Sequence, residues 1–333
     1  MFRSFSCSAI AVLFLLFAPA SARSAEDFSD IPRVDVHAHV GALEQMPHYL
    51  EVRKVIKDEF NIDLALWINV SSRLGHGDDG WDYLKEVEEK YNGRFLTCLT
   101  NHRINMGIKF TPEELTVWQS RGVVGFKIWV GKSTAIDHPA NDPAFTKMEQ
   151  IGMIGASIHI AQPYPRNETD PVNYWACINA WERVLDRHPD LKVVNAHMMD
   201  IFYSDEQLEY LQYFLETYPN VSVDIAARFK DFYAMKTENI RNFVIKYQDR
   251  ILFGTDIGRQ PASGNYREVA ELYNRCFMAL EKKGTLPGGF FGDREIEGIA
   301  LPREVLEKIY YRNAVRIYPR VGEVMKKLGY SID

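Results

Sequence analysis

The 333-residue chain has few cysteines and no excess of basic residues. Besides Cys7 near the N-terminus, it holds Cys98, Cys177 and Cys276, and an odd number leaves at least one thiol unpaired. A chain of this length needs no disulfide framework, so we expect these three to be buried and free. The net charge is −6 with both signs spread along the chain, which argues against a nucleic-acid partner.

Glycine-rich nucleotide loops are also missing. No Gly-x-Gly-x-x-Gly follows the first predicted strand, and no Walker-type loop is present, which removes the usual dinucleotide and nucleotide interpretations. Beyond the N-terminal region no apolar run is long enough to span a bilayer. We therefore expect a mature chain without a membrane span.

The N-terminus is typical of an export signal. Arg3 precedes a short apolar stretch, and Ala20-Ser21-Ala22 offers the small residues that signal peptidase requires. The pattern predicts a signal peptide over residues 1–22, an exported (periplasmic or secreted) protein, and a single domain over 23–333. A membrane anchor is the alternative.

Short β-rich apolar runs alternate with helical patterns eight times, without a linker between them. This alternation predicts parallel strands closed into a (β/α)8 TIM barrel, an α/β fold. A doubly wound open sheet is the alternative. The predicted strands cover residues 34–39, 64–70, 95–101, 124–130, 157–162, 192–197, 221–227 and 251–256.

Several segments carry helix start and end signals. Thr111-Pro112 reads as an N-cap followed by proline at the first helical position, and Asp142-Pro143 and Ser204 open helices in similar ways. The cations Arg187 and His188 suit the end of the helix before Pro189. The glycine-rich segment 284–300 is expected to form a loop near the barrel mouth, followed by a helical segment at about 302–328.

Polar residues gather where the predicted strands end. Residues two apart on a strand share a face, so His37 and His39 should both point into the barrel. Barrel enzymes place their chemistry at these carboxyl ends. Each residue alone has an ordinary explanation, such as a core histidine or a turn cap, but the combination predicts a site for a divalent metal, with Zn²⁺ favoured. The members of this set are His37, His39, His159, His197 and Asp256.

Other charged and aromatic residues lie near the same ends. Lys127 and Trp129 share a face of the fourth strand, and Arg228 and Arg259 follow the seventh and eighth. Arginine binds carboxylates bidentately, so an inward arginine would indicate an organic acid or lactone as substrate. A surface salt bridge for each arginine, and core packing for Trp129, are the alternatives.

Taken together, these motifs resemble the amidohydrolase superfamily, in particular its amidohydrolase-related branch with the aminocarboxymuconate-semialdehyde decarboxylase-like proteins. The resemblance runs from Val34 to about Pro319 and implies a metal-dependent enzyme on a barrel. It is carried by Asp35-Val-His-Ala-His39, Gly125-Phe-Lys-Ile-Trp129, Ile158-His-Ile160, Asn195-Ala-His197, Tyr218-Pro-Asn-Val-Ser-Val-Asp-Ile-Ala-Ala-Arg228, Tyr247-Gln-Asp-Arg-Ile-Leu-Phe-Gly-Thr-Asp256 and Tyr311-Arg-Asn-Ala-Val-Arg316.

The resemblance also implies roles. His37, His39, His159 and Asp256 match the family's metal ligands. His197 matches an acid/base or oxygen-polarising group in members with one ion and a second-metal ligand in members with two. Lys127 matches the position that is carbamylated in two-metal members. The following Ile128-Trp129 is more similar to the one-metal branch, which favours one ion and an unmodified Lys127.

A bound divalent ion makes water a nucleophile at neutral pH, and Asp256 is placed to shuttle its proton. His197 would polarise the substrate oxygen, while Lys127, Trp129, Arg228 and Arg259 are the candidate substrate-binding residues. The favoured function is hydrolysis of a C–N or C–O bond (amide, ester or lactone) in a small molecule. Metal-dependent decarboxylation of an unsaturated or aromatic acid and a non-catalytic binding protein are the alternatives, and the oligomeric state stays open.

Overall fold

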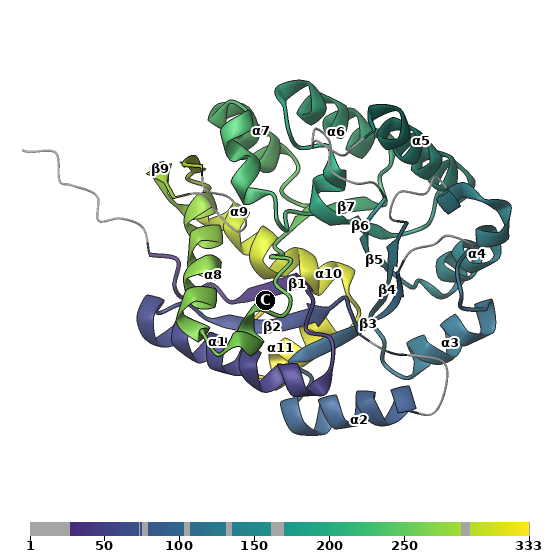
Figure 1. Cartoon of the computed structure of the whole chain (residues 1–333), viewed down its shortest axis with the longest axis horizontal. Helices are drawn as coiled ribbons and strands as arrows, with labels where there is room; N and C mark the ends of the chain where they lie inside the picture. The colour runs from purple at the N-terminus through teal and green to yellow at the C-terminus, as the bar shows by residue number, and fades with distance from the viewer. Residues whose placement is uncertain are drawn as a thin grey trace, which may run out of the picture.

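The structure is a computed structural model that describes residues 27–72, 74, 79–102, 107–130, 135–160, 170–287 and 294–332. Eight parallel strands pair in chain order, and helices cover the outside of the sheet (Figure 1). This confirms the predicted barrel. The strands are β1 Arg33–Ala38, β2 Leu64–Asn69, β3 Phe95–His102, β4 Gly125–Trp129, β5 Gly155–Ile158, β6 Val193–Asn195, β7 Val221–Asp224 and β8 Ile251–Leu252.

The backbone that continues β8 meets β1 and brings the two ends of the sheet together. The amide of Val36 donates to the Phe253 carbonyl at 3.0 Å, and the amide of Asp256 donates to the His37 carbonyl at 2.8 Å. The amide of His39 then donates to the Ile257 carbonyl at 2.7 Å. Residues that are distant in sequence thereby become neighbours at the barrel mouth.

The helices between the strands begin where their capping residues predict. The Thr111 and Glu114 side chains form a capping box, each accepting from the other residue's backbone amide. The Ser204 side chain accepts from the amide of Gln207. The outer helices are α1 Met46–Phe60, α2 Asp79–Tyr91, α3 Pro112–Ser120, α4 Asp142–Ile151, α5 Pro171–Arg187, α6 Asp205–Thr217, α7 Thr237–Lys246 and α8 Tyr266–Glu281.

Both faces of the strands are buried, as expected of a sheet that is filled inside and covered by helices outside. Every residue of β1 and of β2 is buried. Cys98, Cys177 and Cys276 are buried thiols that form no disulfide with one another, as predicted, while Cys7 lies outside the described residues. No helix in the described ranges is both long and apolar enough to cross a membrane.

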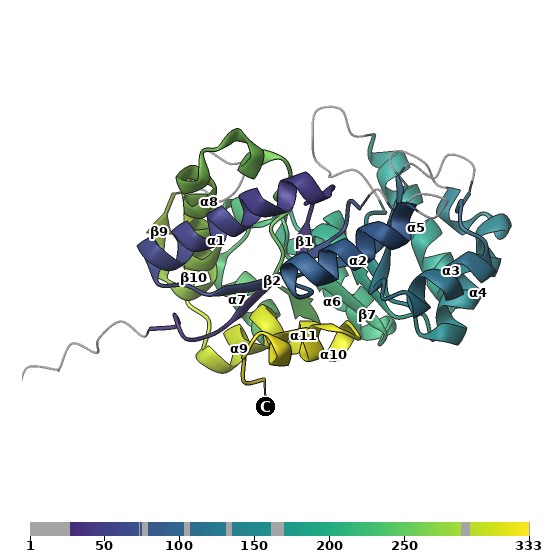
Figure 2. The same ribbon diagram turned by 90° about the horizontal axis from the view of Figure 1, so that it is seen from below.

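The C-terminal segment is helical, as predicted, and lies beneath the sheet (Figure 2). It is anchored by Asn313, whose amide nitrogen Nδ2 donates to the carbonyls of Gln248 at 2.7 Å and Ile251 at 2.8 Å. The segment therefore covers the amino end of β8, opposite the end where the polar residues gather. It comprises α9 Arg303–Glu307, the π-helical turn Lys308–Arg312, α10 Asn313–Ile317 and α11 Val321–Lys327.

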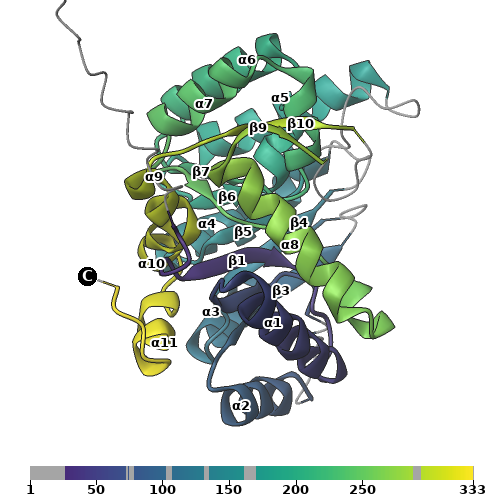
Figure 3. The same ribbon diagram turned by 90° about the vertical axis from the view of Figure 1, so that its left-hand side faces the viewer.

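The prediction that residues 284–300 form a loop is wrong, because part of this segment forms two strands. Strands β9 Lys283–Leu286 and β10 Ile296–Ile299 form an antiparallel hairpin beside α7 and α8 (Figure 3), and residues 288–293 are outside the described part. Ile296 and Ile299 are buried while Glu297 is exposed. A Cβ at Gly298 would lie 2.3 Å from the Lys282 carbonyl oxygen, so glycine there permits close strand approach rather than marking a loop.

Candidate metal centre

Two histidines leave β1 on the side that faces the barrel interior. The His37 side chain is fully buried, and the His39 side chain is 28% exposed. The His37 side chain packs closely against the segment after β8, where only glycine fits. A Cβ at Gly254 would lie 2.8 Å from the His37 Cβ. The two histidines form the predicted pair, although the register of β1 against β2 shifts between Asp35 and Ala38.

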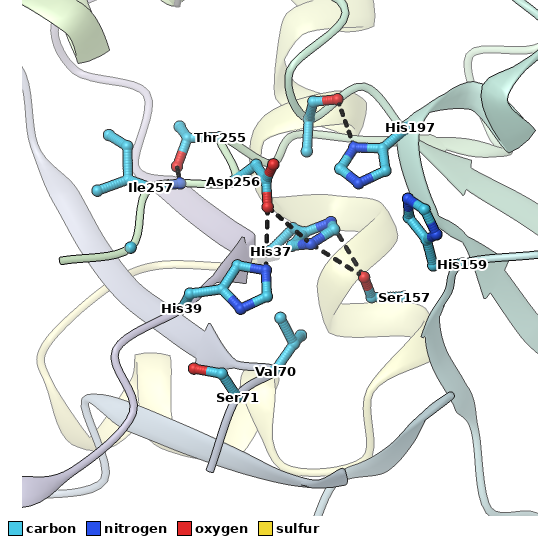
Figure 4. Close-up of polar contacts among 12 residues, drawn as sticks. His37, His39, Val70, Ser71, Ser157, His159, His197, Thr255, Asp256 and Ile257 are labelled. Atoms are coloured by element: carbon cyan, nitrogen blue, oxygen red, sulfur yellow. Dashed lines mark hydrogen bonds and ion pairs between the residues drawn. The ribbon is translucent and has the colours of Figure 1, made fainter. Parts of the chain in front are cut away.

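Asp256 reaches both histidines from the segment after β8 (Figure 4). Its Oδ1 lies 3.3 Å from His37 Nε2 and 3.0 Å from His39 Nε2. One ligand atom from each of the three side chains lies within 4.8 Å of the others. Three of the four predicted metal ligands are therefore brought together.

Asp224 of β7 determines which nitrogen of His37 is available. Its Oδ2 lies 3.0 Å from His37 Nδ1, and its Oδ1 accepts from the backbone amide of His197 at 2.9 Å. Because a carboxylate only accepts, Nδ1 carries the hydrogen and the lone pair stays on Nε2. Nitrogen Nε2 then faces the Asp256 oxygen, an arrangement that a cation between the two would stabilise.

The donor set fits a divalent metal ion. Neutral imidazoles and an ionised carboxylate are the forms that bind such ions. Burial lowers the pKa of His39, and it lowers the pKa of His159 well below the ordinary range. Burial would raise the pKa of Asp256, but the nearby histidines keep it well below its usual value. His37, His39 and Asp256 therefore offer two nitrogens and an oxygen to one ion.

Lys127 of β4 joins the same buried region through Ser157 of β5. The Lys127 ammonium Nζ donates to Ser157 Oγ at 2.8 Å. This hydroxyl oxygen also lies 3.0 Å from Nδ1 and 3.2 Å from Nε2 of His37. Burial lowers the pKa of Lys127 to about 8. The chain thus places a cation within two contacts of a candidate metal ligand.

His159 and His197 lie across from His37. The ring centroids of His159 and His197 are 5.0 Å apart, and those of His37 and His197 are 4.8 Å apart. Among the described residues, two groups of three side chains could hold a metal ion. The first is His37 with His39 and Asp256, and the second is His37 with His197 and Asp224. The structure brings His197 close to His37 and leaves His159, the fourth predicted ligand, outside both groups.

A hydrogen bond also sets the tautomer of His197. Its Nδ1 lies 2.9 Å from the Ala226 carbonyl oxygen, which can only accept, so Nδ1 carries the hydrogen. Burial lowers the pKa of His197 to about 3, so the ring is neutral. Its Nε2 therefore carries the lone pair and is suited to bind a cation.

The backbone after β6 is left-handed over four consecutive residues. The φ angles are 58° at His197, 52° at Met198, 60° at Met199 and 56° at Asp200. Each non-glycine residue in this conformation costs about 1–2 kcal/mol, and strained backbone concentrates at functional sites. The turn places the buried Asp200 carboxylate 3.5 Å from His159 Nε2.

The two predicted arginines lie in different environments. Arg228 is 2% exposed; its Nη1 donates to the Tyr203 hydroxyl and lies 3.2 Å from Asp231 Oδ2. Arg259 is exposed and lines a cavity of about 730 Å³ that includes His39 and Ser71. Arg228 is thus paired within the protein, while Arg259 faces the space beside the candidate metal centre.

Trp129 sits at the end of β4, where its ring lies edge-on to His159 with centroids 5.8 Å apart. It is partly buried and borders the site rather than the core alone. Sequence reasoning missed Ser157 and Asp200. Ser157 lies two residues before His159 on the same predicted strand and could have been found by that spacing. The left-handed turn that places Asp200 has no comparable signal.

Comparison with known proteins agrees with this geometry. Residues 34–320 match the profile of the amidohydrolase family. The chain belongs to the amidohydrolase family. Amidohydrolases are metal-dependent enzymes, and this chain is an enzyme with candidate metal-binding residues. Among curated proteins, no relative matches the chain.

Solved structures of other amidohydrolase-type barrels resemble this amidohydrolase at low identity. Dihydroorotase from Campylobacter jejuni is 15% identical with a TM-score of 0.51, over 86% of this chain and 82% of that one. An amidohydrolase from Burkholderia multivorans with bound HEPES is 14% identical with a TM-score of 0.51, over 86% and 98%. 2,6-Dihydroxybenzoate decarboxylase from Rhizobium is 15% identical with a TM-score of 0.49, over 86% and 98%.

Proposed function

We propose that this amidohydrolase hydrolyses a C–N or C–O bond (amide, ester or lactone) of a small organic molecule with the help of one divalent metal ion, with zinc favoured. The observation that carries the proposal is the convergence of His37 Nε2, His39 Nε2 and Asp256 Oδ1 beside an open cavity of about 730 Å³. His159 is the proposed fourth ligand. A divalent ion held there would supply Lewis-acid chemistry, activating water or polarising a substrate oxygen.

The protein's own residues then divide the remaining work. Asp256 Oδ1 is placed to accept a proton from the attacking water and return it to the leaving group. With its hydrogen on Nδ1, His197 presents the acceptor Nε2, which can receive a hydrogen bond from the attacking water or from a substrate hydroxyl. Lys127, held by Ser157, contributes positive charge beside the developing negative charge.

We further propose that the substrate carries a carboxylate, or is a lactone whose ring-opened product does. Among the described residues Arg259 has no carboxylate partner within ion-pair distance, and it lines the cavity with the hydroxyls of Ser71, Ser72 and Thr100. Such a group can bind an oxyanion at the cavity mouth. Trp129 would form an aromatic wall near His159. The buried Arg228 would influence substrate binding only indirectly, through its contacts with Tyr203 and Asp231.

An activity assay tests the proposed reaction. The metal-reconstituted protein is supplied with carboxylated amides, esters and lactones, and acid release is followed beside CO₂ release. Hydrolysis without CO₂ is expected. Release of CO₂ from an unsaturated or aromatic acid would instead show the decarboxylase alternative, and absence of turnover with every class would contradict catalysis by this site.

The number of ions is a separate question, and we propose one. The support is the sequence Ile128-Trp129 after Lys127, which is more similar to the one-metal branch of the family and favours an unmodified lysine. His197→Asn should then leave the metal content unchanged at about one ion per chain, because His37, His39 and Asp256 remain. Elemental analysis of wild type and variant side by side checks this. Two ions in wild type and fewer in the variant would contradict it.

We also propose that the chain is exported after cleavage near Ala22. Residues 1–22 lie outside the described part of the chain, so the support is the sequence pattern at Arg3 and Ala20-Ser21-Ala22. N-terminal sequencing of the native protein should begin close to residue 23. A native protein that begins at Met1 would contradict export by this route.

A further inference from the structure

We propose that Asp200 is a positioning residue that orients His159 toward the metal centre. The inference rests on the proposed function, because it takes His159 as a metal ligand. Asp200 is fully buried, and its Oδ2 lies 3.5 Å from His159 Nε2. Carboxylates that accept the second N–H of a ligating histidine fix its tautomer and raise its affinity for the ion.

The two ring nitrogens of His159 have different surroundings. Nitrogen Nε2 faces Asp200, whereas Nδ1 is buried and has no hydrogen-bond partner within the described part of the chain. The 3.5 Å separation is longer than an ordinary hydrogen bond, but a carboxylate beside Nε2 favours the tautomer with the hydrogen on Nε2, which leaves the lone pair on Nδ1. The arrangement leaves one buried acceptor on His159, and a cation is the partner that suits it.

The left-handed turn places Asp200 in this position and is held at both ends. The backbone amide of His197, where the turn begins, donates to Asp224 Oδ1 at 2.9 Å. The carbonyl of Asp200, where it ends, accepts from the Tyr174 hydroxyl at 2.6 Å. A right-handed continuation of the chain would move the carboxylate away from His159, so the strained conformation and the pairing occur together.

Arg228 and His159 approach different oxygens of the buried Asp200 carboxylate. Its Nη1 lies 3.9 Å from Asp200 Oδ1, the oxygen that does not face His159. The guanidinium is itself fixed by Asp231 Oδ2 at 3.2 Å and by the Tyr203 hydroxyl. Arg228 therefore places a positive charge beside Asp200 on the side that faces away from His159.

The test compares metal dissociation constants across a double-mutant cycle. Asp200→Asn should raise the dissociation constant for Zn²⁺ by about 10–100-fold, whereas it should have no further effect in a His159→Ala background. Asp231→Asn is the matched control, because Asp231 is a buried carboxylate that lies 3.2 Å from the same Arg228. Its dissociation constant should stay close to that of wild type.

Different failures point to different errors. An unchanged dissociation constant in Asp200→Asn, or equal losses with and without His159, would overturn the positioning role. A wild-type protein that takes up no metal would overturn the proposed function itself. If Asp200→Asn fails to fold, ¹⁵N NMR of histidine in the metal-free wild type still decides: the Nε2–H tautomer of His159 is expected, and the Nδ1–H tautomer would overturn the proposal.

Discussion

The two sides of the barrel mouth are built in different ways. On the β1/β8 side, here called the regular side, His37 and His39 both have negative φ, although the register of β1 against β2 shifts between Asp35 and Ala38, and Asp256 has a positive φ of 68°. On the β5/β6 side, Ser157 has a φ of 52° and the four residues from His197 to Asp200 are left-handed. The first side follows from local geometry, whereas the second depends on contacts that hold an unfavourable backbone.

This difference suggests a division of labour. Three candidate ligand atoms already converge on the β1/β8 side, while His159 lies beyond them. We therefore expect the regular side to provide most of the metal affinity and the irregular side to adjust the geometry of the site.

The largest effect is expected from His37→Ala combined with His39→Ala. Because two of three converging ligands are lost, the variant should bind no metal after reconstitution and should have no activity. Elemental analysis checks the metal content. His159→Ala with His197→Ala should only weaken binding, and His48→Ala, whose histidine pairs with Tyr266 on α8, is the control. Equal losses on both sides of the mouth would remove the contrast.

Asp256→Asn should separate metal binding from catalysis on the regular side. The amide keeps an oxygen near the ion but cannot take a proton from water. Activity should fall by about 10²–10⁴-fold, as is typical for loss of general acid–base catalysis, while much of the metal is retained. Asp249→Asn, at an exposed aspartate, is the control. Full activity in Asp256→Asn would show that another group moves the proton.

Lys127→Met tests the buried cation on the β4/β5 side through the pH dependence of stability. Burial lowers the pKa of Lys127 from 10.5 to about 8 in the folded protein. Below about pH 8 the lysine is charged in both the folded and the unfolded protein, and burying this charge lowers the free energy of unfolding. Wild type should therefore become more stable relative to the variant as pH rises from about 8 to about 10.5, by up to about 3 kcal/mol.

Chemical denaturation of both metal-free proteins at about pH 7 and about pH 10 measures this difference. The comparison cancels the other titrating groups, because both proteins carry them. A difference in the free energy of unfolding that does not change with pH would show that Lys127 titrates normally.

The smallest effect is expected at the cavity mouth. Arg259→Gln removes a charged hydrogen-bond donor worth about 1.5–3 kcal/mol, so KM for a carboxylated substrate should rise with little change in kcat. The matched uncharged substrate should show no such rise. Steady-state kinetics with both substrates checks this, and equal effects on the two would contradict recognition of a carboxylate by Arg259.

The sequence predicted much of the fold because the barrel repeats one pattern, apolar strand followed by amphipathic helix. The pairing of His37 with His39 could be predicted because the two residues are two apart on a strand and therefore point to the same face. The hairpin over β9 and β10 was missed because Gly298, which permits close strand approach, looked like a loop residue. Asp200 was missed because a left-handed turn of His197, Met198 and Met199 depends on Asp224 and Tyr174 and not on local propensity.

The most direct test of the metal centre is anomalous diffraction from crystals of the metal-reconstituted protein. One ion should lie at the β1/β8 side, within bonding distance of His37 Nε2, His39 Nε2 and an oxygen of Asp256. His159 should approach through Nδ1, with Nε2 against Asp200. A fully loaded protein whose ion lies elsewhere, or whose His37 and Asp256 do not touch it, would contradict the central claim.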